Sequence, residues 1–152
     1  MLLHLKQLTA AIIISAISYI QVGTAAPLTA QQQSCGVITA LTKGIEVSIP
    51  HIEQLLQSLG KEKVDTISPQ LTKLFKNVKF KGGRVYDIGS LGNDMSEHML
   101  VVERANRPAV YFRFIYHKLA ENMQIVEFSY QPTFKAIIKR NHLSPPVELP
   151  CS

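Results

Sequence analysis

The residues best suited to chemistry lie in the second half of the chain, where Asp87 stands between an aromatic and an aliphatic residue in the stretch VYDIG. A carboxylate can act as a general base, and tyrosine hydroxyls can stabilise a developing oxyanion. Asp87 with Tyr86, Tyr116 and Tyr130 is therefore a candidate set for a cofactor-independent isomerase or lyase. The simpler interpretation, that Asp87 faces water or pairs with a lysine, is favoured.

A hydrolytic triad of His117, Asp87 and Ser90 is conceivable, but nothing in the spacing of the three residues supports it. The sequence has no G-x-S-x-G elbow, no Walker loop, no dinucleotide fingerprint and no H-E-x-x-H motif. We therefore expect no cofactor and no metal, and Asp87 is only a weak catalytic candidate.

The stretch AVYFRFIYHKL, residues 109–119, predicts the longest strand, because apolar and polar side chains alternate along it. One face is apolar and aromatic; it holds Val110, Phe112, Phe114 and Tyr116. Arg113 and His117 lie on the other, mixed face. The next strand, residues 123–131, splits in the same way, with Val126, Phe128 and Tyr130 expected on the apolar face.

These two strands suggest two kinds of contact. If a pocket opens between the helices and the aromatic face, a small apolar ligand would touch the rings on that face. The expected ligand-binding residues are Phe112, Phe114, Tyr116, Phe128 and Tyr130. On the mixed face, Arg113 should lie near Glu127 or Ser129 across the hairpin, as an exposed pair that contributes little. The mixed face is also apolar enough to be covered by a second subunit, which would make the protein a homodimer.

The first half of the chain has helical periodicity in short pieces. We expect a short helix ending at Gly44, a second with Pro50 in its first turn, and a third with Ser68 as N-cap and Pro69 as its first residue. The expected apolar stripes comprise Ile52, Leu55, Leu56, Leu59, Leu71, Leu74, Phe75 and Val78. From Lys79 the period changes to two. This order predicts an α+β fold, with short N-terminal helices packed on one face of a curved antiparallel β-meander.

The N-terminus reads as a targeting signal. One cation, Lys6, precedes a short apolar run and small residues, which is typical of a secretory signal peptide cut after Ala25. The predicted organisation is a signal peptide (1–25), a leader and short helix (26–47), one α+β domain (48–140) and a Pro-rich tail (141–152). We expect a secreted or periplasmic protein with no stable membrane anchor after cleavage.

Cys35 and Cys151 are the two cysteines of the chain, and they flank the predicted domain. In an oxidising compartment such a pair is first interpreted as a disulfide, with free thiols or a link to a second chain as alternatives. The net charge is +5, but the lysines are scattered and form no basic stripe with stacking aromatics. The charge therefore does not argue for nucleic acid as a partner.

Residues 48–131 resemble the nuclear-transport-factor-2-like, cystatin-like cone superfamily. The resemblance rests on short helices, a Ser-Pro step before LTKLF, and a meander ending in MQIVEFSYQ. It implies helices packed on a bent sheet and an apolar pocket at the wide end. Some members are isomerases or dehydratases with an Asp/His/Tyr pocket, and others only bind ligands or partners, so the fold does not decide the function. We expect a non-enzymatic binding domain for an apolar small ligand or a protein partner. The alternatives are an isomerase or lyase using Asp87 and a structural homodimer.

Overall fold

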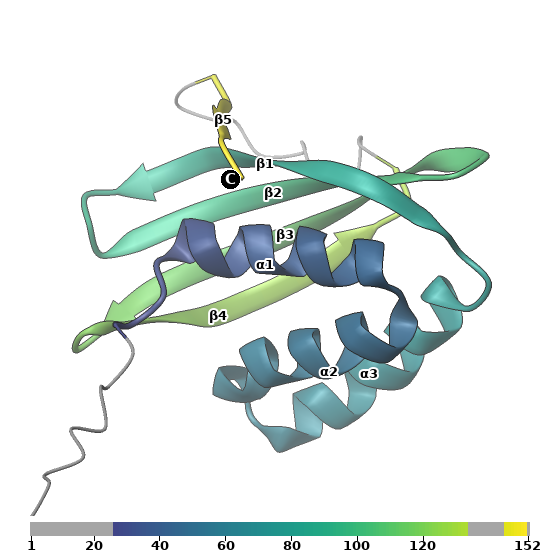
Figure 1. Ribbon diagram of the computed structural model, residues 1–152. Coiled ribbons are helices and arrows are strands. Elements are labelled where there is room, and N and C mark those ends of the chain that lie inside the picture. Colours follow the sequence, from purple (N-terminus) through teal and green to yellow (C-terminus); the bar gives the residue numbers. More distant parts are fainter. Residues whose placement is uncertain (1–25, 134–144, 152) are drawn as a thin grey trace, which may run out of the picture.

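The structure is a computed structural model that describes residues 26–133 and 145–151. Within these residues, helices precede the strands and pack against an open, curved antiparallel sheet (Figure 1), which confirms the predicted α+β fold. The elements are α1 (Ala30–Lys43), α2 (Ile45–Leu56), the 3-10 turn η1 (Gln57–Leu59), α3 (Lys61–Phe75), β1 (Phe80–Leu91), β2 (Met95–Arg104), β3 (Arg107–Leu119), β4 (Asn122–Gln131) and β5 (Val147–Leu149). The predicted signal peptide, residues 1–25, lies outside the described residues.

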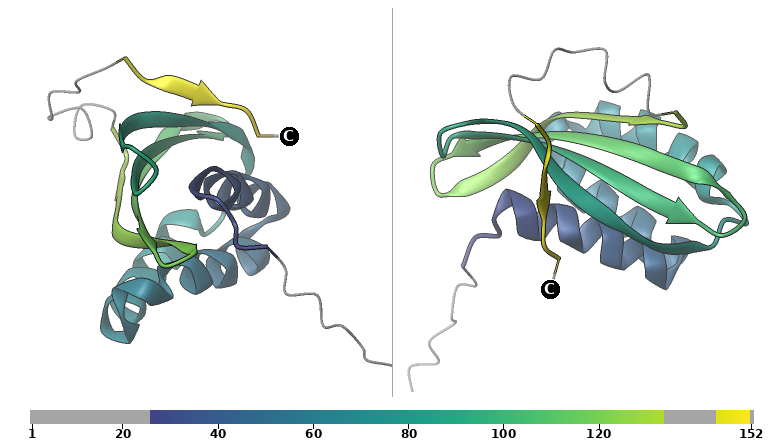
Figure 2. Two further views of the ribbon diagram at one scale, coloured as in Figure 1. Left: turned by 90° about the vertical axis from the view of Figure 1, so that its left-hand side faces the viewer. Right: turned by 90° about the horizontal axis from the view of Figure 1, so that it is seen from above.

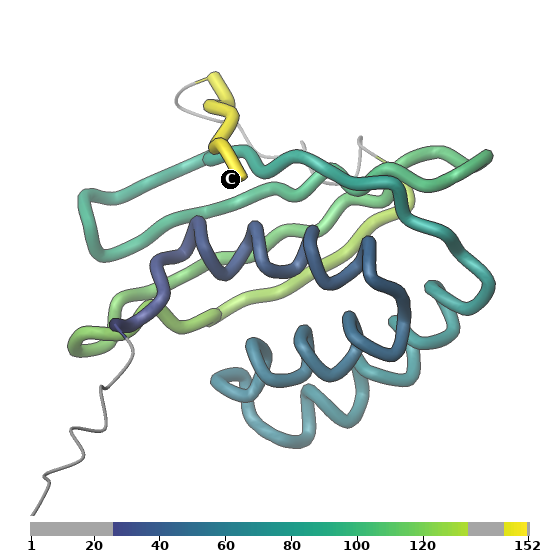
Figure 3. Tube along the Cα trace, viewed as in Figure 1, coloured from purple at the N-terminus to yellow at the C-terminus, as the bar shows by residue number. Residues whose placement is uncertain are grey.

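The sheet has the strand order β4-β3-β2-β1-β5, and every neighbouring pair is antiparallel. It curls around the helices, so that α1 lies in the hollow of the sheet and α2 and α3 close the side below it (Figure 2). The tube in Figure 3 follows the chain from α1 through α2 and α3 into β1. In the part of the chain that the structure describes, no helix is long and apolar enough to cross a membrane.

Helix α1 begins inside the segment that was predicted as leader. Thr29 caps it: its hydroxyl accepts a hydrogen bond from the backbone N–H of Gln32, whose side chain bonds back to the backbone N–H of Thr29. The helix ends at Lys43, before Gly44, whose φ of 110° leaves the helical region. The predicted helix end at Gly44 is therefore confirmed, and α1 is longer at its start than the sequence suggested.

The starts of α2 and α3 were predicted wrongly, because Pro50 and Pro69 lie inside these helices and not in their first turns. Each helix begins directly after a glycine with positive φ, Gly44 or Gly60. Proline removes one intrahelical hydrogen bond but does not prevent a helix when tertiary packing supports the turns on either side. Val64, in the turn before Pro69, packs against the core and provides such support.

The core lies between the concave face of the sheet and the helices. Phe75 of α3 packs edge-on against Phe112, with ring centroids 5.9 Å apart. The strand register shifts between Ile115 and Tyr116, where β4 has a bulge. The expected inward position of Val126 is wrong: Val126 is 42% exposed, and its neighbour Ile125 is 1% exposed and faces the core.

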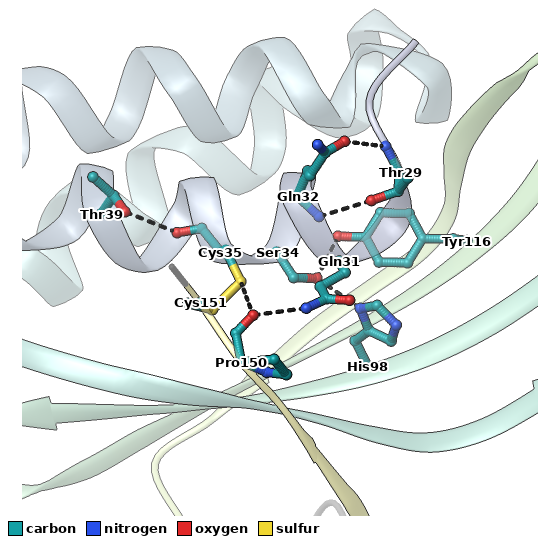
Figure 4. Close-up of a disulfide and its surroundings, with 10 residues drawn as sticks. All are labelled: Thr29, Gln31, Gln32, Ser34, Cys35, Thr39, His98, Tyr116, Pro150 and Cys151. Carbon is teal, nitrogen blue, oxygen red and sulfur yellow. Dashed lines mark hydrogen bonds between the residues drawn. A yellow bond between two sulfur atoms is a disulfide. The ribbon is translucent and has the colours of Figure 1, made fainter. Parts of the chain in front are cut away.

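The C-terminal segment is fastened to both layers. Strand β5 pairs with β1, with Val147 opposite Asp87 and Leu149 opposite Val85. Cys35 of α1 forms the predicted disulfide with Cys151, with the two Cα atoms 5.4 Å apart (Figure 4). This bond ties α1 to the residue two positions after the end of β5, so the helix in the hollow is held covalently to the edge of the sheet.

Candidate functional site

The five aromatic residues predicted to line a ligand pocket belong to the packed core. Phe112, Phe114 and Tyr116 are fully buried, and Phe128 and Tyr130 are half-buried against the same cluster. Their neighbours are other protein rings; for example, the Phe114 and Phe128 centroids are 5.1 Å apart. None of the five lines the pocket described next, and in this structure their rings pack against the core.

A pocket of about 450 Å³ is lined by residues from the start of α1 and from the β1–β2 and β3–β4 turns. These segments lie at the same end of the sheet (Figure 1). We call this cavity the end pocket. Its polar lining residues are Thr29, Gln31, Asp87, Asn93, Ser96, His98, Lys118 and Glu121, and its apolar ones include Pro27, Leu28, Met123 and Leu149. It therefore combines apolar walls with charged and hydrogen-bonding groups from both the helix α1 and the sheet.

Asp87 lines the end pocket, opposite His98 on the neighbouring strand β2. Its carboxylate accepts hydrogen bonds from the backbone N–H of Gly89, at 3.0 Å, and from the hydroxyl of Ser90, at 2.7 Å. Both carboxylate oxygens are thus engaged within strand β1. The weak catalytic candidate lines a pocket, but its carboxylate is already hydrogen-bonded to two residues that do not line the pocket.

The other sequence candidates are dispersed. Tyr86 packs against the Ile88–Met99 cluster, which is separate from the main core. Tyr130 donates a hydrogen bond to Gln70, with 3.1 Å between the oxygens. His117 lies opposite Gln124 on β4 and does not line the end pocket. The structure thus brings none of these three side chains together with Asp87.

A buried polar group that the sequence analysis missed lies behind the end pocket (Figure 4). It consists of Ser34 on α1, His98 on β2 and Tyr116 on β3, with exposures of 0%, 3% and 0%. Ser34 Oγ is 2.9 Å from His98 Nδ1 and 2.8 Å from the Tyr116 hydroxyl. Ser34 therefore bridges the other two, and the bridge joins the helix to two strands of the sheet.

Burial controls the protonation of this group. Burial raises the pKa of the Tyr116 phenol, and the hydrogen bond with Ser34 opposes this only in part, so Tyr116 keeps its proton. Burial lowers the pKa of His98, and the negative charge of Asp87 offsets a smaller amount. His98 is therefore a neutral imidazole at neutral pH, in which one ring nitrogen carries a proton and can donate a hydrogen bond while the other can only accept one.

The signal that could have revealed this group is a polar residue at a core position. His98 shares the inward face of β2 with Leu100 and Val102, and Ser34 shares the buried stripe of α1 with Val37 and Leu41. Buried polar side chains need partners, so two such residues in separate elements predict a contact between them.

A second polar cluster lies on the outer face of the sheet. Arg113 pairs with Glu127, one of the two partners that the sequence suggested, and also with Glu97 on β2. The expectation of an exposed pair was wrong for the arginine, which is packed between strands on both sides. Arg113 is buried, whereas the Glu127 side chain is 48% exposed, and Arg113 Nη2 is buried without a hydrogen-bond partner. Within residues 26–133 and 145–151, no group of three or more His, Cys, Asp or Glu side chains could hold a metal ion.

Comparison of the chain with protein-family models, with curated proteins and with solved structures gave no match. The resemblance to the nuclear-transport-factor-2-like superfamily therefore stays a prediction from the sequence pattern, and the function has to be argued from the site itself.

Proposed function

We propose that the protein is a non-enzymatic small-ligand-binding domain that works outside the cytoplasm, and that its binding site is the end pocket. The observation that carries the proposal is the pocket itself, with a volume of about 450 Å³ and a lining of apolar and polar groups from separate elements. Ligand sites typically have volumes of about 300–1,000 Å³, with mostly apolar walls and a few convergent polar groups.

The proposed site replaces the aromatic face as the place of binding. A ligand at Phe112 or Phe114 would have to displace fully buried rings, and opening a packed core costs several kcal/mol, about as much as truncating such a ring. The end pocket needs no such opening. Its ligand has an apolar part that lies against Leu28 and Met123 and a polar part that reaches His98.

The compartment is supported by the disulfide and by the predicted signal peptide, because disulfides persist mainly in oxidising compartments. The test is intact mass measurement of the protein exported by a bacterial host, under non-reducing conditions. We expect a chain that begins at Ala26 and lacks two hydrogens relative to the reduced form. An uncleaved, reduced chain in the cytoplasm would contradict this part of the proposal.

Binding is tested with a chemically diverse fragment library and ligand-observed NMR. Ser96 lines the end pocket, so Ser96→Phe should fill it, whereas Val126→Phe adds the same ring at an exposed position of β4. We expect fragments that bind the wild type and Val126→Phe and lose binding to Ser96→Phe, with both variants folded by circular dichroism. If no fragment distinguishes the two variants, the end pocket is not the site.

A second candidate function, a cofactor-independent isomerase or lyase, is favoured by one observation: Asp87 and His98 are cross-strand neighbours that line the same pocket. Such an enzyme should accelerate exchange of the α-protons of cyclohexanone in D₂O, and Asp87→Asn should abolish the acceleration. The binding proposal expects exchange at the rate of the buffer, because the Asp87 carboxylate is already held by Gly89 and Ser90.

A further inference from the structure

We propose that His98 presents an Nε2–H donor to the end pocket, and that the pocket accordingly takes a neutral carbonyl compound, an amide or a ketone, as its ligand. The first part concerns the protein alone. The second part rests on the proposed function, because it names the ligand class of the same site.

The direction of the buried hydrogen bonds follows from counting donors and acceptors. If the Tyr116 hydroxyl donates to Ser34, then Ser34 can donate to His98 Nδ1, and every hydroxyl proton has an acceptor. In the opposite direction His98 Nδ1–H donates to Ser34 and Ser34 donates to Tyr116. The phenol proton of the fully buried Tyr116 would then have no acceptor among the described contacts, which is costly.

The mixed arrangement fails for the same reason. If Tyr116 and His98 both donated to Ser34, the serine proton would need a third partner, and the described contacts of the Ser34 hydroxyl are these two. Only the order Tyr116 to Ser34 to His98 satisfies all the protons. In this order Nδ1 is an acceptor, so the ring proton of the neutral imidazole is on Nε2.

Nε2 is the atom that reaches the pocket. His98 lines the end pocket, and its Nδ1 is turned toward Ser34 (Figure 4). In the described part of the chain, the buried side-chain atoms without a hydrogen-bond partner are His51 Nε2 and Arg113 Nη2, and His98 Nε2 is not among them. Since no described hydrogen bond engages Nε2, this atom is accessible, and in the pocket that His98 lines water or a ligand can accept from Nε2–H.

The charges around the pocket select the kind of acceptor. Asp87 and Glu121 supply two negative charges and Lys118 supplies one positive charge, with Asp87 across the strand pair from His98. A carboxylate ligand at Nε2 would meet the charge of Asp87, and an amine offers no acceptor in its protonated form. A neutral carbonyl oxygen accepts from Nε2–H without either penalty, and its apolar remainder lies against Met123.

The tautomer is measured first, without any ligand, by two-bond ¹H–¹⁵N correlation spectra of protein labelled at histidine. The His98 signals are assigned by their loss in His98→Gln. We expect the Nε2–H tautomer to exceed the Nδ1–H tautomer by about tenfold or more in the wild type, as one unsatisfied buried donor would dictate. A predominant Nδ1–H tautomer would overturn the inference.

Ser34→Ala is the informative variant, because it removes the hydroxyl that donates to His98 Nδ1. Neither tautomer then has a described partner at Nδ1, so the tautomer ratio should fall toward one. The ratio for His117, which lies on the neighbouring strand β3 and outside the end pocket, should not change. An unchanged His98 ratio in folded Ser34→Ala would contradict the donor count, whereas Tyr116→Phe should keep the wild-type ratio, because Ser34 can still donate only to His98.

The ligand class is tested with benzamide, benzoate and benzylamine, which share a ring and differ in charge. We expect benzamide to bind about tenfold or more tightly than either charged compound, to shift the His98 Nε2–H signal, and to lose binding in His98→Leu but not in His117→Leu. Tighter binding of benzoate or benzylamine at the pocket would refute the ligand class alone. Failure of all three to bind would refute the ligand class together with the proposed function, and the tautomer result would stand separately.

Discussion

Replacing Ser34 by alanine should destabilise the fold far more than the loss of one small side chain suggests. The change removes a single oxygen but leaves two buried groups without partners, the Tyr116 hydroxyl and His98 Nδ1. Each unsatisfied buried group costs about 1–3 kcal/mol, so we expect Ser34→Ala to lower the free energy of unfolding by about 2–6 kcal/mol. A domain of this size is typically stable by about 5–15 kcal/mol, so the variant should still fold.

The double-mutant cycle with Tyr116→Phe isolates the bridge. In the wild type, Tyr116→Phe removes one hydrogen bond while Ser34 still donates to His98, and should cost about 1 kcal/mol. In the Ser34→Ala background the same change removes an orphaned hydroxyl, and should be neutral or slightly stabilising. The coupling energy between the two sites should therefore be about 1–2 kcal/mol.

The assay is urea unfolding of the oxidised protein at pH 7.5, followed by far-UV circular dichroism and analysed by linear extrapolation. Ser48→Ala is the matched control, because Ser48 is equally buried and its hydroxyl contacts only a carbonyl of its own helix, at 3.4 Å from Ile45 O. It should cost less than about 1 kcal/mol. The reasoning is refuted if Ser34→Ala costs no more than Ser48→Ala, or if Tyr116→Phe costs the same in both backgrounds.

Three further outcomes are expected. Replacing Cys35 and Cys151 by serine removes a cross-link between residues 116 positions apart and should lower the free energy of unfolding in urea by about 5 kcal/mol, because the unfolded chain gains conformational entropy. A loss below about 1 kcal/mol would show that the disulfide does not stabilise the fold by constraining the unfolded chain. Glu97→Gln should cost about 2–3 kcal/mol in the same assay, because the buried Arg113 keeps its charge and loses its less exposed partner. Glu127→Gln changes a half-exposed side chain and should cost less than about 1 kcal/mol. The reverse order would show that Glu127, and not Glu97, is the main partner of Arg113. Below pH 6.5 the unfolded chain binds a proton at His98 that the folded chain resists. As the pH is lowered, the free energy of unfolding should therefore fall more steeply in the wild type than in His98→Gln. Equal slopes would exclude a lowered pKa for His98 in the fold.

The order of helices and strands could be predicted from the sequence because apolar residues recur about every 3.6 positions in a half-buried helix and every 2 positions in a half-buried strand. The errors fall where tertiary contacts outweigh local rules. Pro50 and Pro69 were placed in first helical turns by a local preference, but each helix starts at a preceding glycine and continues through its proline. Val126 was placed inward by strict alternation, and the bulge opposite Tyr116 moved Ile125 into that position. The alternation of apolar residues does not reveal a bulge, because a bulge is defined by the pairing with the neighbouring strand.

The candidate site was predictable only in part. The sequence singled out Asp87 and Tyr116, and both lie at or behind the end pocket. It did not single out Ser34 and His98, which lie between them, because Ser34 is 64 residues from His98 and 82 residues from Tyr116 along the chain. Contacts of that separation depend on how a helix docks on a sheet, and no local spacing encodes them.

The disulfide and the site depend on the same docking. Cys35 follows Ser34 on α1, and its partner Cys151 follows β5, which pairs with β1 at Asp87 and contributes Leu149 to the end pocket. The covalent bond therefore joins the helix that supplies the bridging serine to the strand that supplies a pocket wall. Because a hydrogen bond tolerates only a few tenths of an ångström of displacement before it weakens, the position of α1 over the sheet decides whether Ser34 reaches both partners. The disulfide that the cysteine pair predicts is thus part of what orients His98.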